Sequence, residues 1–166
     1  MLPVSQTTVR AGAGASSVST GVSVLDRLIE LTARAARFEV ALTLAPDEPE
    51  AEVDTAGAEL GLALRPLLHA RDARRHGLGI MPTDEALASV VLEVSGRPLV
   101  ASNVDLAPSH VGGLSTDLAQ RFLTALADAA GLTIHVRLIE GEETGHVVEA
   151  IFKALGVALA DACSAV

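Results

Sequence analysis

The sequence predicts an α+β fold made by internal duplication, in which one two-layer unit, a sheet backed by two helices, occurs twice. The pentapeptide LGLAL of Leu60–Leu64 returns as LGVAL at Leu155–Leu159, 95 positions later, and the segments FEVALTL and LTIHVRL lie 94 positions apart. The order helix, strand, loop, helix also occurs twice. We therefore expect a first repeat over residues 1–80 and a second over residues 81–166, joined in one compact domain.

The elements of the first repeat follow from composition and hydrophobic spacing. Residues 1–20 are rich in Ser, Thr, Gly and Ala, which predicts a short strand and then a flexible loop. Apolar residues at helical spacing predict a helix over Val24–Phe38, and FEVALTL alternates as a strand does. The acidic segment Pro46–Asp54 predicts a turn or loop, and Ala56–Arg75 predicts a second helix that is interrupted or bent near Pro66.

The second repeat is predicted in the same way. Residues Gly77–Leu106 indicate two strands around a turn at Ser95 and Gly96. A helix follows, with Ser115 or Thr116 as its N-cap and Gly131 just beyond its end. The strictly alternating TIHVRLI predicts a half-buried strand, and the last helix begins near Thr144.

Composition excludes several classes of protein. Hydrophobic residues make up 49% of the chain but aromatic residues only 2%, so the core must consist of Ala, Val, Leu and Ile. The net charge of −9 argues against nucleic-acid binding, because the usual basic stripe is missing. Cys163 is the single cysteine, which excludes an internal disulfide. No apolar run reaches the roughly 18 residues of a membrane helix, and the first residues do not form a signal peptide, so we expect a cytoplasmic protein without membrane contact.

Seven short motifs in one order resemble the imidazoleglycerol-phosphate dehydratase family, which acts as a lyase in histidine biosynthesis. The resemblance implies a duplicated α+β fold whose unit is similar to domain 2 of ribosomal protein S5. It also implies a large symmetric homo-oligomer, trimer-based and up to a shell of about 24 subunits. The motifs are STGVSVLDRL (Ser19–Leu28), RRHG (Arg74–Gly77), DEALA (Asp84–Ala88), SGRP (Ser95–Pro98), VGGLSTDL (Val111–Leu118), GLTIHVR (Gly131–Arg137) and EAIFKAL (Glu149–Leu155).

The resemblance also implies where the family's chemistry would lie. The family binds two manganese ions through a His after the LD pair and a His-His-x-x-Glu pattern in each repeat, with residues of neighbouring subunits completing each site. Imidazole and carboxylate groups suit such an ion, and positions i and i+3 share one helix face. The positions that correspond here are Arg27, Glu50, Asp54, His146 and Glu149.

This sequence departs from the family pattern at most of these positions. Arg27 replaces the first His, Glu50 and Ala51 replace one His pair, and Gly145 replaces the first His of the other pair. A permanent guanidinium charge opposes a divalent cation. We therefore predict that manganese and the catalytic residues are lost, and hypothesise that Arg27 pairs with the remaining carboxylates instead.

The phosphate-binding positions of the family are better preserved. The resemblance assigns the substrate phosphate to an Arg in the GRP motif, a second Arg, a Lys in FKA and a C-terminal Ser. Arg97 and Lys153 remain here, His110 stands for the second Arg, and the Ser is missing. A small molecule that bears a phosphate group is therefore a candidate ligand.

Three functions remain open from the sequence. The first is a non-catalytic homologue, natural or engineered, that keeps the oligomeric fold. The second is a binder of a phosphorylated small molecule through Arg97 and Lys153. The third is a histidine-biosynthesis dehydratase whose site is rearranged or completed by a partner chain.

Overall fold

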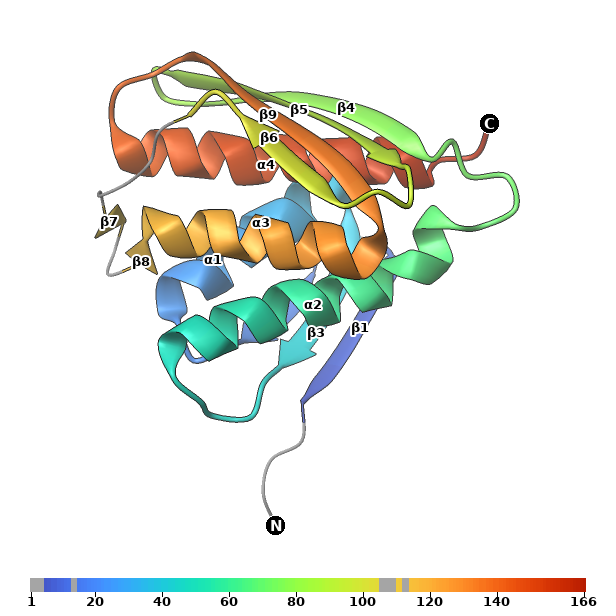
Figure 1. Ribbon diagram of the computed structural model, residues 1–166, viewed down its shortest axis with the longest axis horizontal. Helices are drawn as coiled ribbons and strands as arrows, with labels where there is room; N and C mark the ends of the chain where they lie inside the picture. Colours follow the sequence, from blue (N-terminus) through green and yellow to red (C-terminus); the bar gives the residue numbers. More distant parts are fainter. Residues whose placement is uncertain (1–4, 13–14, 105–109, 112–113) are drawn as a thin grey trace.

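The computed structural model describes residues 5–12, 15–104, 110–111 and 114–166 of the chain. Within them, two outer sheets enclose a double layer of helices (Figure 1). The first sheet has the order β1-β3-β2, the second has the order β4-β5-β9-β6, and β7 and β8 form a separate small pair. The strands are β1 Gln6–Ala11, β2 Ser16–Ser19, β3 Phe38–Thr43, β4 His76–Thr83, β5 Ala86–Val94, β6 Leu99–Ser102, β7 His110–Val111, β8 Leu114–Ser115 and β9 Leu132–Glu140. The helices are α1 Ser23–Ala36, α2 Pro49–Leu68, α3 Thr116–Ala130 and α4 Thr144–Cys163.

The predicted duplication is confirmed by the strand pairing. β3 runs antiparallel to β1 and parallel to β2, and β9 runs antiparallel to β5 and parallel to β6. Before each of these two central strands, one residue in the left-handed conformation ends the preceding helix. These residues are Arg37, with a φ of 58°, and Gly131, with a φ of 72°, and they lie 94 positions apart. β4 has no counterpart in the described part of the first repeat.

The helices of the two repeats pack in parallel pairs, α1 on α4 and α2 on α3. Gly156 of α4 lies so close to α1 that a Cβ there would be 2.2 Å from the Thr32 carbonyl oxygen. Gly57 and Gly61 of α2 also allow a close approach to α3, where an added Cβ would lie 2.6 Å from the Phe122 carbonyl oxygen and 2.8 Å from Cβ of Ala129, respectively. Figure 1 shows α2, α3 and α4 starting on the same side of the molecule. The helix N-termini, which carry partial positive charge, are therefore gathered at one end.

The core lies between the sheets and consists of Ala, Val, Leu and Ile, as the composition predicts. Phe122 of α3 and Phe152 of α4 add one tilted ring contact at its centre, with ring centroids 5.6 Å apart. The stripe of α4 that includes Ala150, Ile151 and Leu155 is buried within the chain itself. None of the described helices is long and apolar enough to cross a membrane.

Three local predictions in the first repeat were wrong. Part of the expected flexible loop is strand β2, which forms because its backbone pairs with β3 and not because its side chains alternate in polarity. The expected acidic loop is largely the start of α2, since Pro49 suits the first helical position and Glu50 and Glu52 favour the helix dipole. α2 continues through Pro66 and ends at Leu68, seven residues before the expected end.

The described part of the segment Gly77–Leu106 contains the three strands β4, β5 and β6, where two were predicted. A tight turn at Asp84 and Glu85 separates β4 from β5. Asp84 has a φ of 51°, a left-handed conformation, and the sequence did not indicate this turn because no glycine stands there. The segment at Ser95 and Gly96 does not join neighbours, because β9 lies between β5 and β6. The predictions for β9 and α4 are confirmed. The proposed N-cap side chains of α3 lie outside the described side chains.

Candidate functional site

An ion pair joins α1 to α4 at the helix N-termini. Nη2 of Arg27 lies 2.8 Å from Oε1 of Glu149, a side chain that is only 21% exposed. The parallel packing of α1 on α4 brings the two residues together, each near the start of its helix. The predicted pairing of Arg27 with a carboxylate of the family's ligand positions is thus present within one chain.

A second ion pair joins α3 to α2. Nε and Nη2 of Arg121 donate to the two carboxylate oxygens of Asp54 at 2.7 and 2.8 Å, a bidentate arrangement, and Nη1 lies 3.5 Å from Glu50. The hydrogen bonds from Arg121 lower the pKa of Asp54. The same contact with Asp54 raises the pKa of Arg121. Both acidic positions of the first repeat therefore face one guanidinium group.

The two ion pairs are related by the internal duplication. Arg121 lies 94 positions after Arg27, and Glu149 lies 95 positions after Asp54, which are the spacings of the repeat. Our sequence reasoning missed Arg121 because it followed the family motifs, which do not include this position. The spacing itself was the available signal, since adding 94 to Arg27 leads directly to Arg121.

His146 is held by a different group of acids. Its Nδ1 lies 2.8 Å from Oε1 of Glu85, and its Nε2 lies 3.2 Å from Asp84 in the turn between β4 and β5. Glu143 caps α4 by accepting from the backbone N–H groups of Gly145 and His146, and these bonds lower the pKa of Glu143. The Glu85 carboxylate, followed by the other acids, raises the pKa of His146.

The contact of His146 with the β4–β5 turn predicts a pH-dependent stability. Because the folded pKa is raised above the usual value of about 6.5, the contact stabilises fully below that pH and is lost as pH rises through the folded pKa. We expect the melting temperature of the wild type to exceed that of His146→Gln at pH 5.5 and to equal it at pH 8.5. Thermal melts of both proteins check this expectation. The same difference in melting temperature between wild type and variant at both pH values would contradict it.

Two of the predicted phosphate-binding residues, Arg97 and Lys153, do not meet within one chain. Nζ of Lys153 donates to the Pro82 carbonyl and lies 3.3 Å from Oγ1 of Thr83, at one end of β5. Arg97 is exposed at the other end, roughly 27 Å away along the eight steps of β5. His110 lies in β7, and its side chain is outside the described part.

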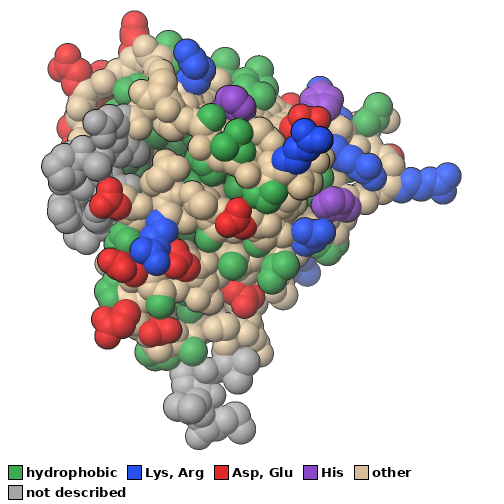
Figure 2. Space-filling model, viewed as in Figure 1, with side chains coloured by type: hydrophobic (Ala, Val, Ile, Leu, Met, Phe, Trp, Pro, Cys, Tyr) green, Lys and Arg blue, Asp and Glu red, His purple; other side chains and the backbone are tan. Residues whose placement is uncertain are grey.

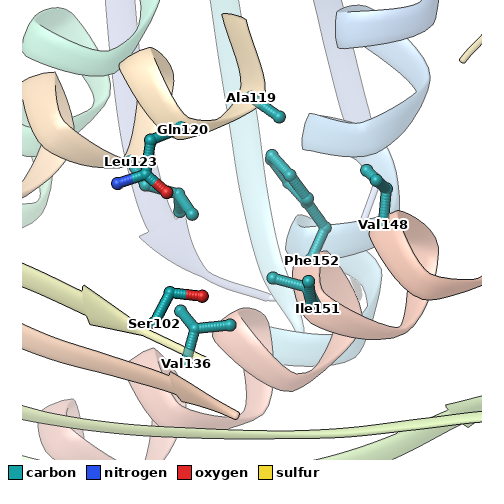
Figure 3. Close-up of a pocket in the computed structure, with 8 residues that line it drawn as sticks. All are labelled: Ser102, Ala119, Gln120, Leu123, Val136, Val148, Ile151 and Phe152. Atoms are coloured by element: carbon teal, nitrogen blue, oxygen red, sulfur yellow. The ribbon is translucent and has the colours of Figure 1, made fainter. Parts of the chain in front are cut away.

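Three hollows in the described part of the structure lie away from the ion pairs of Arg27 and Arg121, and the third of them, about 130 Å³, lies beside Asn103 and His135. The cavity in Figure 3 lies between α3, α4 and the strands β6 and β9, and its volume of about 10 Å³ holds at most one water. An open hollow of about 680 Å³ lies against the first sheet, beside Thr8, Arg10 and Glu39. Among the described residues, no group of three or more His, Cys, Asp or Glu side chains is arranged to hold a metal ion.

Charge is distributed unevenly over the molecule. Figure 2 shows acidic side chains gathered near the ends where α2 and α3 begin, and basic and histidine side chains toward the opposite end. Acids near helix N-termini and bases near helix C-termini both complement the helix dipoles. Arg27 and Arg121 are cations placed at the N-terminal ends, where the dipoles alone would not favour them. Their carboxylate partners supply the stabilisation instead.

Comparisons with known proteins all indicate one family. The family model described as imidazoleglycerol-phosphate dehydratase matches residues 20–159. The imidazoleglycerol-phosphate dehydratase of Acetivibrio thermocellus is 37% identical over 155 residues, which are 91% of this chain and 80% of that protein. The crystal structure of the Staphylococcus aureus dehydratase aligns with a TM-score of 0.87 at 29% identity, over 98% of this chain and 99% of that one. The Pyrococcus furiosus enzyme aligns with a TM-score of 0.86 at 30% identity, over 100% and 93% of the two chains.

Proposed function

The chain belongs to the imidazoleglycerol-phosphate dehydratase family of histidine-biosynthesis lyases, and we propose that it is a non-catalytic member that keeps the fold. The observation that carries the proposal is the pair of arginines at repeat-related positions. Arg27 binds Glu149 and Arg121 binds Asp54, so the carboxylates that correspond to family ligands already have cationic partners.

The donor set fits two manganese ions poorly. Borderline divalent ions favour several imidazole and carboxylate ligands. Of the family's histidine ligands only His146 is kept, and both its ring nitrogens face Asp84 and Glu85 in the β4–β5 turn. Two guanidinium groups lie beside the remaining carboxylates, and like charges so close together oppose metal binding. No catalytic step through manganese is therefore assigned to these residues.

The proposal predicts that the purified protein does not dehydrate imidazoleglycerol phosphate, even with added Mn²⁺. We also expect that it does not restore growth to a histidine auxotroph that lacks its own dehydratase. The Acetivibrio thermocellus relative serves as the positive control in both assays. Turnover or growth would instead support an active dehydratase with a rearranged site. Activity only upon co-expression with a second, complete dehydratase chain would support a partner-completed site.

A second candidate is the binding of a phosphorylated small molecule, and the position of Arg97 favours it. Among the described residues its guanidinium has no hydrogen-bond partner, and it follows β5, whose Val94 N–H donates to the Arg75 carbonyl. The backbone of Arg75 thus lies beside Val94, three residues before Arg97, whereas Lys153 would have to come from another copy. A rise in melting temperature with glycerol phosphate that is lost in Arg97→Ala supports this function.

The remaining proposals concern the location, the oligomeric state and the partners of the protein. We propose a cytoplasmic homo-oligomer without nucleic acid, in keeping with the acidic composition and the single cysteine. The size of the assembly is measured by light scattering on a size-exclusion column. A single species with the mass of one chain would contradict this proposal.

A further inference from the structure

Two basic side chains lie together on the outer face of the second sheet. Along β9, Ile134 and Val136 are buried, whereas the alternate residues His135 and Arg137 are exposed. Successive side chains of a strand point to opposite faces, so His135 and Arg137 share the face turned away from the core, about 7 Å apart along the strand. Among the described residues, neither side chain has a hydrogen-bond or ion-pair partner.

The neighbouring strand β5 places no acid directly opposite these two side chains. His135 lies opposite Val91, and Arg137 lies opposite Ser89. Residues directly opposite one another have Cβ atoms about 4.5–5.5 Å apart, which makes them the closest neighbours across the sheet. The one acid of β5, Glu93, is diagonal to His135 and two outward-facing pairs away from Arg137. In a chain with a net charge of −9, the Arg137 guanidinium is thus left without a carboxylate beside it.

A hollow of about 130 Å³ opens beside the two basic side chains, where β6 ends. The residue of β6 beside His135 is Ala101, and its single methyl group leaves this space open. One water takes about 30 Å³ in the liquid, so the hollow has the size of about four waters, enough for a carboxylate or phosphate group. The hollow is lined by Ala101, Ser102, Asn103, His135, Val136 and Arg137.

Asn103 fixes one wall of the hollow. Its Nδ2 donates to the Leu138 carbonyl at 3.2 Å, and its Oδ1 accepts from the Leu138 N–H at 2.8 Å. Its own backbone N–H donates to the Val136 carbonyl at 3.3 Å. The amide oxygen is therefore occupied by β9, while the second hydrogen on Nδ2 can still donate to a ligand. A wall that is already ordered lowers the entropic cost of binding.

We propose that this hollow binds the carboxylate group of a small molecule with an apolar body. The Arg137 guanidinium offers a planar fork of N–H donors that matches the two carboxylate oxygens, and the imidazole of His135 keeps at least one N–H donor in every protonation state. One permanent positive charge balances a carboxylate, whereas a phosphate monoester carries about −1.5 to −2. The charge of the hollow therefore favours a carboxylate over a phosphate group.

The side chains next to the hollow determine the rest of the ligand. Val91, opposite His135, is 47% exposed, and Leu78, opposite Val91 on β4, is 49% exposed. A ligand held by its carboxylate at Arg137 can lay a short hydrocarbon chain over these two side chains and remove apolar surface from water.

This hollow is separate from the candidate phosphate-binding residue Arg97. Oγ1 of Thr133 donates to the Arg97 carbonyl at 3.0 Å, and Thr133 lies four residues before Arg137, about 13 Å along β9. The proposal also does not depend on whether the dehydratase chemistry is kept, because neither His135 nor Arg137 contacts the ion pairs of the helix N-termini.

Three matched ligands test the chemistry of the hollow: hexanoate, hexanol and acetate. Saturation-transfer nuclear magnetic resonance measures their dissociation constants with the full chain in its native assembly. We expect hexanoate to bind about tenfold or more tightly than hexanol, which lacks the charge, and than acetate, which lacks the apolar body. Hexanol binding as tightly as hexanoate, inorganic phosphate binding more tightly than hexanoate, or no binding of hexanoate at all would overturn the proposal.

Variants of the chain test the location of the site. Arg137→Gln removes the charge, and Ala101→Leu fills the hollow while every charge is kept, so each should weaken hexanoate binding by about tenfold or more. Arg71→Gln and Arg97→Gln remove exposed guanidinium groups elsewhere and are the matched controls, with binding as in wild type. An unchanged circular dichroism spectrum shows that each variant is folded. Equal binding by wild type and Arg137→Gln, or an equal loss in the control variants, would place the ligand outside this hollow and overturn the proposal.

Discussion

Replacing Arg27 and Gly145 together by histidine is expected to raise the affinity for Mn²⁺ by roughly 100-fold or more, since even outer-shell changes alter metal affinity by about 10–100-fold. The double variant removes one guanidinium from Glu149 and adds two imidazoles near it. Position 145 lies one helical turn before Glu149, on the same face of α4. Isothermal titration calorimetry with Mn²⁺ measures the effect.

The matched control for this variant is Arg27→Gln with Gly145→Ala. It removes the same positive charge and the same glycine but adds no imidazole, so its gain in affinity for Mn²⁺ should be much smaller than that of the histidine variant. A Cβ at Gly145 would lie 3.0 Å from Oε2 of Glu143, the end of a flexible side chain that can move. If the control gained as much affinity as the histidine variant, charge removal alone would explain the gain and the missing imidazoles would not matter.

Replacing Gly79 by alanine is expected to lower the free energy of unfolding by about 2–3 kcal/mol, the upper range for overpacking a tight contact. The added Cβ would lie 2.1 Å from the Ala154 carbonyl oxygen, so β4 and α4 must separate. For a chain of this size, each 1 kcal/mol lowers the melting temperature by about 2–4 °C. Differential scanning calorimetry at fixed protein concentration measures the shift.

Gly12→Ala is the matched control for the packing of β4 on α4. It also adds one Cβ, but its nearest neighbour is the flexible Glu39 side chain, 2.5 Å from the added atom, which can rotate away. We expect its melting temperature to stay within a few degrees of wild type. Equal losses in the two alanine variants would mean that the intrinsic conformational freedom of glycine, and not the approach of β4 to α4, determines the stability.

The duplication could be predicted because similar segments recur at a constant spacing in the sequence. The left-handed positions at Arg37 and Gly131 occupy equivalent places, although only one of them is a glycine. Strand β2 and the turn at Asp84 could not be predicted, because each depends on a partner that is distant in the sequence or on a residue type that does not signal a turn. Local patterns identify elements, whereas pairing across the sheet decides their limits.

The candidate site could be predicted only in part, because the contacts between its residues depend on packing. The family motifs led to Arg27 and Glu149, and the structure brings these two together. They did not lead to Arg121, because its role arises from the close crossing of α2 and α3. They grouped Arg97 with Lys153, which lie at opposite ends of β5 within one chain. Motifs give positions in a family, and only packing gives the contacts between them.

The metal content of the purified protein tests most directly the claim that arginine pairs have taken the place of the metal ions. The protein is expressed with added manganese, purified without chelators, and measured by elemental mass spectrometry on each size-exclusion peak. We predict manganese, iron and zinc close to zero per chain in every peak. About two ions per chain, as in two-metal sites, would contradict the account and support dehydratase activity.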